Sequence, residues 1–334
     1  MIDGALARAL RFAVPALLVL AGCEGGIDSL DAGTGIDAGA RVDAGFQARD
    51  AGPAVVDSGS PPDSGAPADA GESGGQDSGV IGPVTPPKPS AGCGKGGRPS
   101  GGTVTVTNDH IYTFPATYDG TKPFPLLMGF HAASNPIDQI RTLTNGSEFE
   151  TSYVRAFPKS AGSQWVYNTD RAKVIAVYDE LMASYCIDTN RVFATGHSSG
   201  AQMIVQILTK ASDAGHFNFK AVAPVAASNY GAFTTPIPVM YIQGAKDSER
   251  KSDGADVVAQ FTKVNTCTTT KVPDTSVSTC MSGSTTVNPG CVEYQGCSKP
   301  TFWCSHNDPA YSGTSHGWPC FATKAMYDFF TALP

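Results

Sequence analysis

The sequence predicts an α/β fold with a mostly parallel central sheet and helices on both of its faces. Between residues 92 and 334, short runs that are apolar throughout alternate with segments of helical periodicity. Strands that are buried on both faces are typical of parallel sheets. This segment is also of a size that can bury a full core as one domain. A third observation is a serine between two glycines, GHSSG at residues 196–200, at a point where an apolar run meets a helix.

The expected elements follow one another in an alternating order. The strands are expected at 104–107 and 110–115, which form a hairpin, and at 125–131, 153–158, 191–195, 220–226, 238–243 and 301–304. The helices show apolar residues three or four positions apart, as Val174, Val177 and Leu181 do. They are expected at about 171–185, 199–211, 254–264 and 322–333. This order is the layout that an α/β-hydrolase requires.

The first 23 residues have the layout of a secretory signal. Arg8 and Arg11 precede an apolar run at 12–20, which is too short to span a bilayer as a helix. The run ends in LAGC at residues 20–23, which resembles the lipobox of bacterial lipoproteins. We therefore expect a lipid anchor at Cys23 that attaches the exported protein to a membrane, at the outer membrane or cell surface. An ordinary cleaved signal and a secreted protein are the alternative.

The cysteine count fits export. The chain has nine cysteines, and removal of Cys23 leaves eight, which is enough for four disulfides. Eight cysteines allow 105 pairings, so the connectivity cannot be deduced. Cys304 and Cys320 bracket a loop, and a bridge between them, or one from each to elsewhere, would fix its position.

Residues 24–91 are expected to form a flexible acidic spacer. They contain almost no aromatic residues and repeat Asp-Ala-Gly or Asp-Ser-Gly. Such a composition cannot bury enough apolar surface to offset its conformational entropy. A calcium-binding repeat is the alternative, but the glycine-rich nonapeptide of calcium-loaded β-helices is absent. The domain boundaries are therefore expected at residues 23 and 91, with the folded domain at 92–334.

Ser198 is the candidate nucleophile. The sequence GHSSG fits G-x-S-x-G, in which a sharp turn between a strand and a helix exposes the serine hydroxyl. The apolar run RVFAT at 191–195 precedes it and the helical sequence SGAQMIVQIL follows it. The hydroxyl would then lie at a helix N-terminus, where a developing negative charge is favoured. A simple helix N-cap is the structural alternative.

A serine nucleophile needs a base and an orienting acid, which follow it in this order: serine, acid, histidine. Asp247 follows the strand at 238–243, so it is the candidate acid, with Asp253 and Asp256 as alternatives. Two histidines come after Asp247. His316 lies in a glycine-rich loop before the final helix and is the candidate base, with His306 as the alternative.

An oxyanion hole requires backbone N–H donors near the nucleophile. One is expected from Ser199, the residue after Ser198, and the other from the loop MGFHAASNP, at Ala132 or Ala133. His131 in that loop is expected to shape the loop rather than act as a second base.

Three further residues are candidates for contact with the substrate. Trp165 and Trp318 could form an apolar wall for an aromatic or hydroxyacyl group, and ordinary packing is the alternative. His197 is grouped with them because it lies directly before Ser198 in the sequence GHSSG, called the elbow because the chain turns sharply there. We expect no chemical role for His197.

Five stretches resemble a known family. They are AGCGK at 91–95, the strand with His131, CIDTNRVFATGHSSGAQM through the elbow, QGAKD and HGWPCF. Together they are similar to carbohydrate esterase family 1, the secreted feruloyl esterases and polyhydroxybutyrate-depolymerase-like esterases. The resemblance covers nearly all of residues 91–334. It implies an α/β-hydrolase fold and hydrolysis of carboxylic esters by Ser198, His316 and Asp247, without a cofactor.

The chain departs from that family in two places. Many members have a His-Gly pair where this chain has His131-Ala132, and the segment at about 267–297 is an insertion rich in threonine, serine and cysteine. Both differences bear on the substrate. We expect feruloyl or related cell-wall esters, with polyesters as the alternative.

Charge and motifs argue against several other classes. A net charge of -7 and a pI of about 5.3 leave no basic patch for nucleic acid. The cluster of Cys291, Cys297, Cys304 and His306 resembles a metal site, but disulfides are favoured in an exported chain. A non-catalytic surface-binding relative and a serine peptidase remain as alternatives. Peptidases of this fold usually add a large gating domain, for which this chain has no room, so we expect an esterase. We also expect it to be a monomer.

Overall fold

A computed structural model describes residues 85–95, 99, 101–248, 251–309 and 315–334. The predicted signal segment, Cys23 and nearly all of the predicted spacer lie outside the described residues. Within the described ranges, no helix is both long and apolar enough to cross a membrane.

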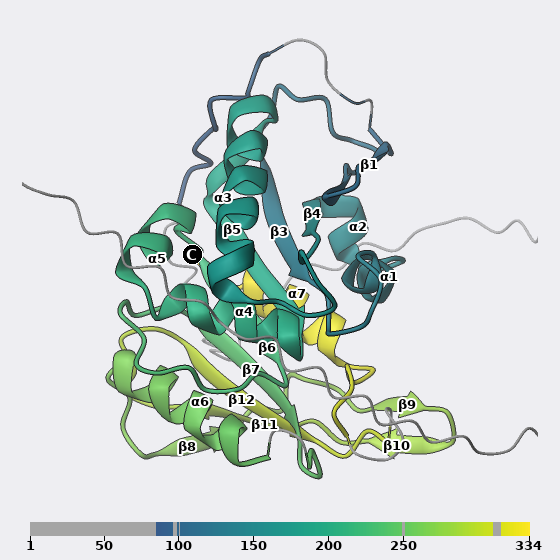
Figure 1. The fold of residues 1–334 in the computed structure, drawn as a ribbon. Coiled ribbons are helices and arrows are strands. Elements are labelled where there is room, and N and C mark those ends of the chain that lie inside the picture. The colour runs from purple at the N-terminus through teal and green to yellow at the C-terminus, as the bar shows by residue number, and fades with distance from the viewer. Residues whose placement is uncertain (1–84, 96–98, 100, 249–250, 310–314) are drawn as a thin grey trace, which may run out of the picture. The chain divides into compact units, whose positions relative to one another are not determined.

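The described residues contain a ten-stranded mixed sheet (Figure 1). Its strands are, in sheet order, β1 (Val104–Val106), β2 (His110–Thr113), β4 (Val154–Pro158), β3 (Phe124–Phe130), β5 (Ile187–His197), β6 (Ala221–Val225), β7 (Val239–Gly244), β12 (Thr301–His306), β11 (Gly290–Tyr294) and β8 (Lys271–Pro273). The six strands from β4 to β12 are parallel, and those at both edges pair antiparallel. The predicted mostly parallel α/β fold is confirmed.

Helices cover both faces of this sheet (Figure 1). They are α1 (Gln139–Thr144), α2 (Glu148–Ser152), α3 (Tyr167–Ser184), α4 (Ser199–Leu208), α5 (Ala211–Phe217), α6 (Lys251–Val264) and α7 (Ala322–Thr331). Alternate residues of β3 separate the two faces. Leu126 and Met128 belong to the core that contains residues of α3, α4 and α6. Leu127 belongs to the core that contains residues of α2 and α7.

The predicted strands and helices are all present, with shifted ends, but several elements were not predicted. These are α1, α2 and α5, the hairpin β9 (Cys280–Ser282) and β10 (Thr285–Val287), and the edge strands β8 and β11. They are short, and most of their residues are polar or exposed. The helix expected at 199–211 is two helices, because α4 ends at Leu208 and α5 begins at Ala211.

The eight described cysteines form four disulfides. The pairs are Cys93–Cys186, Cys267–Cys297, Cys280–Cys320 and Cys291–Cys304. Cys304 and Cys320 therefore do not bond to each other. Three of the four pairs involve the insertion at 267–297, and one of these three, Cys291–Cys304, joins it to β12.

Candidate active site

A sharp turn between β5 and α4 carries Ser198. The serine has φ of 51° and ψ of -115°, a backbone conformation that side chains other than glycine rarely adopt. Its N–H donates to the carbonyl of Val225 on β6 at 2.9 Å. A Cβ at Gly200 would collide with the Phe130 carbonyl, and one at Gly196 would come within 2.9 Å of the Gly200 backbone. The two glycines are therefore required by the close approach of β3, β5 and α4.

Ser198 lies in a continuous chain of hydrogen-bonding side chains. Its Oγ lies 2.9 Å from Nε2 of His316, and Nδ1 of His316 lies 2.9 Å from Oδ2 of Asp247. Asp247 is fully buried, and His316 and Ser198 are 5% and 8% exposed. Of the alternative acids, Asp256 is exposed on α6. The structure thus brings together the serine, histidine and acid that the sequence singled out.

Asp247 and His316 reach the site from two different loops. Asp247 follows β7 in a turn in which its N–H donates to the Gly244 carbonyl at 3.1 Å. His316 lies outside any helix or strand. The backbone of Ser315 passes so close to Gly244 that a Cβ there would collide with the Ser315 carbonyl. The bare backbone at the end of β7 therefore allows the His316 loop to lie against Asp247.

The alternative base, His306, is not part of the hydrogen bonds that join Ser198, His316 and Asp247 among the described residues. It is the last residue of β12 and is 2% exposed. Its Nδ1 accepts a hydrogen bond from the Asp308 N–H at 3.3 Å, and Nε2 has no partner within the described part of the chain. Burial lowers its pKa from 6.5 to about 4, although the nearby carboxylates of Asp308 and Asp247 oppose this effect. No hydrogen bond joins His306 to Ser198 among the described residues.

The loop between β3 and α1, residues 131–138, is called the oxyanion loop below. The Ala132 N–H donates to Oε1 of Gln139 at 2.6 Å. His131 Nε2 accepts from the Ser160 N–H at 3.2 Å, so its Nδ1 carries the proton and donates to the Ala132 carbonyl at 2.8 Å. The N–H and the carbonyl of Ala132 are thus both hydrogen-bonded to side chains. Burial lowers the pKa of His131, which favours this neutral, loop-shaping form.

Two of the predicted N–H donors remain, those of Ser199 and Ala133. Ser199 is the first residue of α4, where backbone N–H groups have no partner within the helix. Ala133 makes no backbone N–H hydrogen bond within the described residues. Gln139, which accepts the hydrogen bond of the Ala132 N–H, was not singled out in the sequence, because no motif marks a single glutamine at the start of a short helix.

The three candidates for substrate contact differ in exposure. Trp165 is 4% exposed, and its indole N–H donates to the His131 carbonyl at 2.9 Å, so it supports the oxyanion loop. His197 has no exposed surface and thus offers none to a substrate. Trp318 is half-buried, two residues after His316, and its indole N–H donates to Oγ1 of Thr323 at 3.1 Å. Only Trp318 of the three has appreciable exposed surface.

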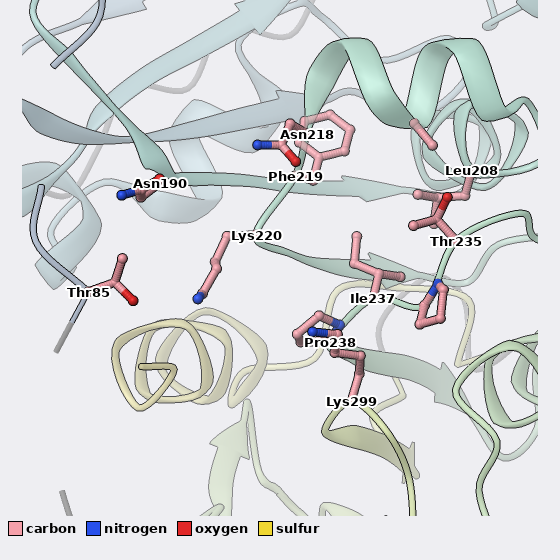
Figure 2. Close-up of a pocket in the computed structure, with 12 residues that line it drawn as sticks. Thr85, Asn190, Leu208, Asn218, Phe219, Lys220, Thr235, Ile237, Pro238 and Lys299 are labelled. Atoms are coloured by element: carbon pink, nitrogen blue, oxygen red, sulfur yellow. The ribbon is translucent and has the colours of Figure 1, made fainter. Parts of the chain in front are cut away.

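A cavity of about 270 Å³ lies at the ends of the parallel strands opposite to Ser198, and Figure 2 shows the residues that line it. Asn190 lies near the start of β5, Lys220 and Pro238 lie just before β6 and β7, and Lys299 lies just before β12. Ser198 and Asp247 follow the other ends of β5 and β7. This cavity is therefore separate from the Ser198 site. Within the described ranges, no group of three or more His, Cys, Asp or Glu side chains could hold a metal ion.

This chain is similar in sequence to several fungal esterases. The chain is 26% identical over 263 residues to the probable feruloyl esterase C of Aspergillus terreus, which covers 72% of this chain and 91% of the relative. It is 24% identical over 266 residues to feruloyl esterase C of Emericella nidulans, which covers 73% of this chain and 91% of the relative. Among solved structures, acetyl xylan esterase from Aspergillus awamori has a TM-score of 0.48 and 14% identity, and covers 69% of this chain and all of that one. No family model matches the chain.

The sheet order and the similarity in sequence to the fungal feruloyl esterases indicate the class of protein. The chain is a carboxylic ester hydrolase with the α/β-hydrolase fold. Within this class it is related to the fungal feruloyl esterases along almost their whole length.

Proposed function

We propose that this protein is a serine esterase that hydrolyses feruloyl or related plant cell-wall esters. In this proposal Ser198 is the nucleophile, His316 the general base and Asp247 the acid that orients it. The observation that supports it most strongly is the buried chain from Ser198 Oγ through His316 to Asp247, with both contacts at 2.9 Å. A serine hydroxyl is a weak nucleophile, and such a chain supplies the activation it needs.

The first half of the reaction forms an acyl-enzyme. His316 Nε2 removes the proton as Ser198 Oγ attacks the ester carbonyl carbon, and Asp247 stabilises the imidazolium through Nδ1–H. The N–H groups of Ser199 and Ala133 hold the negative oxygen of the tetrahedral intermediate. His316 then gives its proton to the alcohol as the ester C–O bond breaks.

The second half releases the acid. His316 removes a proton from a water molecule, which attacks the acyl carbon, and the intermediate collapses to the carboxylic acid and free Ser198. Each proton that His316 takes is returned within the same half-reaction. The cycle therefore needs no metal and no organic cofactor.

The proposed substrate class depends on the relatives. The curated relatives are named feruloyl esterases and are matched over about 90% of their length. An aromatic acyl group would need an apolar surface beside the histidine, and Trp318 has exposed surface two residues after His316. Trp165 would act through the oxyanion loop that it supports.

We also propose that the chain is exported and anchored through a lipid on Cys23. The support is the signal-like segment at 1–23 and the LAGC sequence at its end. The spacer at 24–91 would then hold the esterase at a distance from the membrane, which suits wall-derived esters.

The test is hydrolysis by the protein, produced with its disulfides formed, beside the Ser198→Ala variant as control. The substrates are p-nitrophenyl acetate, p-nitrophenyl butyrate, methyl ferulate and a polyhydroxybutyrate suspension. Turnover of methyl ferulate by the wild type alone supports a feruloyl esterase. Turnover confined to short acyl esters or polymer would replace the substrate class with that of a polyester depolymerase. No Ser198-dependent turnover would favour a surface-binding protein.

A further inference from the structure

A chain of hydrogen bonds links the oxyanion loop to the loop that carries His316. The Ala132 N–H donates to Gln139 Oε1 at 2.6 Å, and Gln139 Nε2 lies 3.3 Å from His197 Nδ1. On the other side of the ring, His197 Nε2 lies 2.6 Å from the backbone carbonyl oxygen of His316. His197 is the residue directly before Ser198, so this series of hydrogen bonds includes the neighbour of the nucleophile in the sequence.

The chemistry of the partners fixes the direction of every bond in this chain. A carbonyl oxygen only accepts, so His197 Nε2 must carry the proton that it shares with the His316 carbonyl. Burial lowers the pKa of His197 to about 4, which keeps the ring neutral and leaves Nδ1 as an acceptor. The Gln139 amide nitrogen donates to Nδ1, which turns Oε1 toward the Ala132 N–H. Each donor therefore meets an acceptor without conflict.

The surroundings of the chain make these bonds matter. His197 has no exposed surface, and Ser198, which follows it in the sequence, is 8% exposed. Hydrogen bonds in such a low-dielectric interior are strong, and a broken one leaves an unpaired buried group. His316 lies outside regular secondary structure, so its position depends on contacts of this kind.

We propose that His197 and Gln139 are positioning residues that keep the His316 loop and the oxyanion loop in register around Ser198. His197 holds the base through the His316 backbone carbonyl, and Gln139 holds the oxyanion loop through the Ala132 N–H. Neither side chain touches the reacting atoms. The inference rests on the proposed function, since it requires His316 to be the base and the oxyanion loop to hold the intermediate.

The first test compares two substitutions of His197. His197→Leu removes both hydrogen bonds, whereas His197→Gln keeps an N–H donor near the position of Nε2. Because a misplacement of about 1 Å can cost about 100-fold in rate, we expect His197→Leu to lower kcat about 10- to 100-fold. We expect KM to change little, since no surface of His197 is open to substrate, and His197→Gln to regain most of the lost kcat.

His216 offers a matched control. It is an exposed histidine on α5 whose Nε2 lies 2.8 Å from Asp179 Oδ1. His216→Leu therefore makes the same chemical change at a residue outside the hydrogen bonds of Gln139, His197 and His316. We expect this variant to keep the wild-type kcat. Thermal unfolding of all variants shows which of them are folded.

The second test asks whether Gln139 and His197 act as one unit. Gln139 is half-buried, so Gln139→Met should fold, and we expect it to lower kcat with little change in KM. In the double variant Gln139→Met/His197→Leu, the two losses of kcat should be less than additive, because both substitutions break the hydrogen bond between Gln139 and His197. If His197→Leu does not fold, Gln139→Met alone decides, and a kcat equal to that of the wild type overturns the proposal.

Other results overturn the inference and leave the proposed function intact. They are losses that add fully in the double variant, equal losses in His197→Leu and His197→Gln, or an increase in KM without a change in kcat. If the Ser198→Ala variant instead hydrolyses the ester as fast as the wild type does, the proposed function is wrong, and the inference with it.

Discussion

The central strands and the disulfide-linked insertion at 267–297 are stabilised in different ways. Every residue of β6 and β7 is buried, as are the last five of β3. In the insertion, by contrast, all three residues of β8 are exposed and only one residue of the β9–β10 hairpin is buried. Three disulfides connect the insertion within itself, to β12 and to the segment before α7. Where a segment buries little apolar surface, covalent links take over its stabilisation.

The proposed catalytic residues depend on both regions. Ser198 and Asp247 follow β5 and β7 of the central sheet. His316 lies four residues before Cys320, whose disulfide to Cys280 joins it to the β9–β10 hairpin. The base is therefore fixed on one side by buried contacts and on the other by a cross-link to the insertion.

The largest expected effect separates the two histidines near the end of the chain. We expect His316→Ala to lower kcat by about 10⁴-fold or more, because loss of a triad member removes the activation of the serine. His306→Ala should keep most of the activity, since His306 makes no hydrogen bond to Ser198 within the described residues. Hydrolysis of p-nitrophenyl acetate by the folded variants measures both. Comparable losses would contradict the assignment of the base.

A matched pair of methionines compares the stability of the two regions. Met128 on β3 is fully buried, and Met281 on β9 is 58% exposed. We expect Met128→Ala to lower the free energy of unfolding by about 2–5 kcal/mol, since it leaves a cavity in the core. Met281→Ala should change it by less than about 0.5 kcal/mol. Denaturant unfolding measures both values, and equal losses would show that the insertion packs as tightly as the sheet.

Two disulfides of similar loop length test the link between the insertion and His316. Replacement of Cys280 and Cys320 by serine should lower the free energy of unfolding by about 2–4 kcal/mol, and replacement of Cys267 and Cys297 should do about the same. Only the first pair should also lower kcat, because Cys320 follows the His316 loop. Thermal unfolding and ester hydrolysis distinguish the two effects. An equal kcat in both variants would mean that the cross-link does not position the base.

A more gradual effect is expected from the buried His306 as the pH falls. Its pKa is about 4 in the folded protein and 6.5 when unfolded, so between these values only the unfolded chain binds the proton. Above pH 6.5 neither state is protonated and stability is unaffected. From pH 6.5 down to about 4, the free energy of unfolding should fall by about 1.4 kcal/mol for each pH unit. In His306→Ala the slope of stability against pH should be smaller by this amount, and an unchanged slope would show that His306 is charged when folded.

The features predictable from sequence were mostly local ones. The Ser198 elbow was predictable because one strand, two glycines and one helix lie within a few residues of each other, and the required geometry leaves little choice of residue. Asp247 and His316, which lie in contact with each other and with Ser198 as the structure shows, could be selected as candidates because the order of residues and the end of a strand limit the choice. The long apolar strands were also found, since burial on both faces leaves a continuous signal in the sequence.

Long-range features could not be predicted. The disulfide between Cys280 and Cys320 spans 40 residues, and no spacing rule selects it from the possible pairings. The hydrogen bonds of Gln139 to His197 and of His197 to the His316 carbonyl join residues 58 and 119 positions apart. His197 could be noticed only as a polar residue inside the elbow. Its partners follow from the folded structure.

The most direct test of the account is the site of reaction with a fluorophosphonate, which forms a covalent bond to an activated serine. After reaction, the protein is digested and the modified peptide is identified by mass spectrometry. We predict one modified residue, Ser198, in the wild type, and no modification in Ser198→Ala or within the same time in His316→Ala. Modification of another serine, or labelling that persists in Ser198→Ala, would contradict the assignment of Ser198 as the nucleophile.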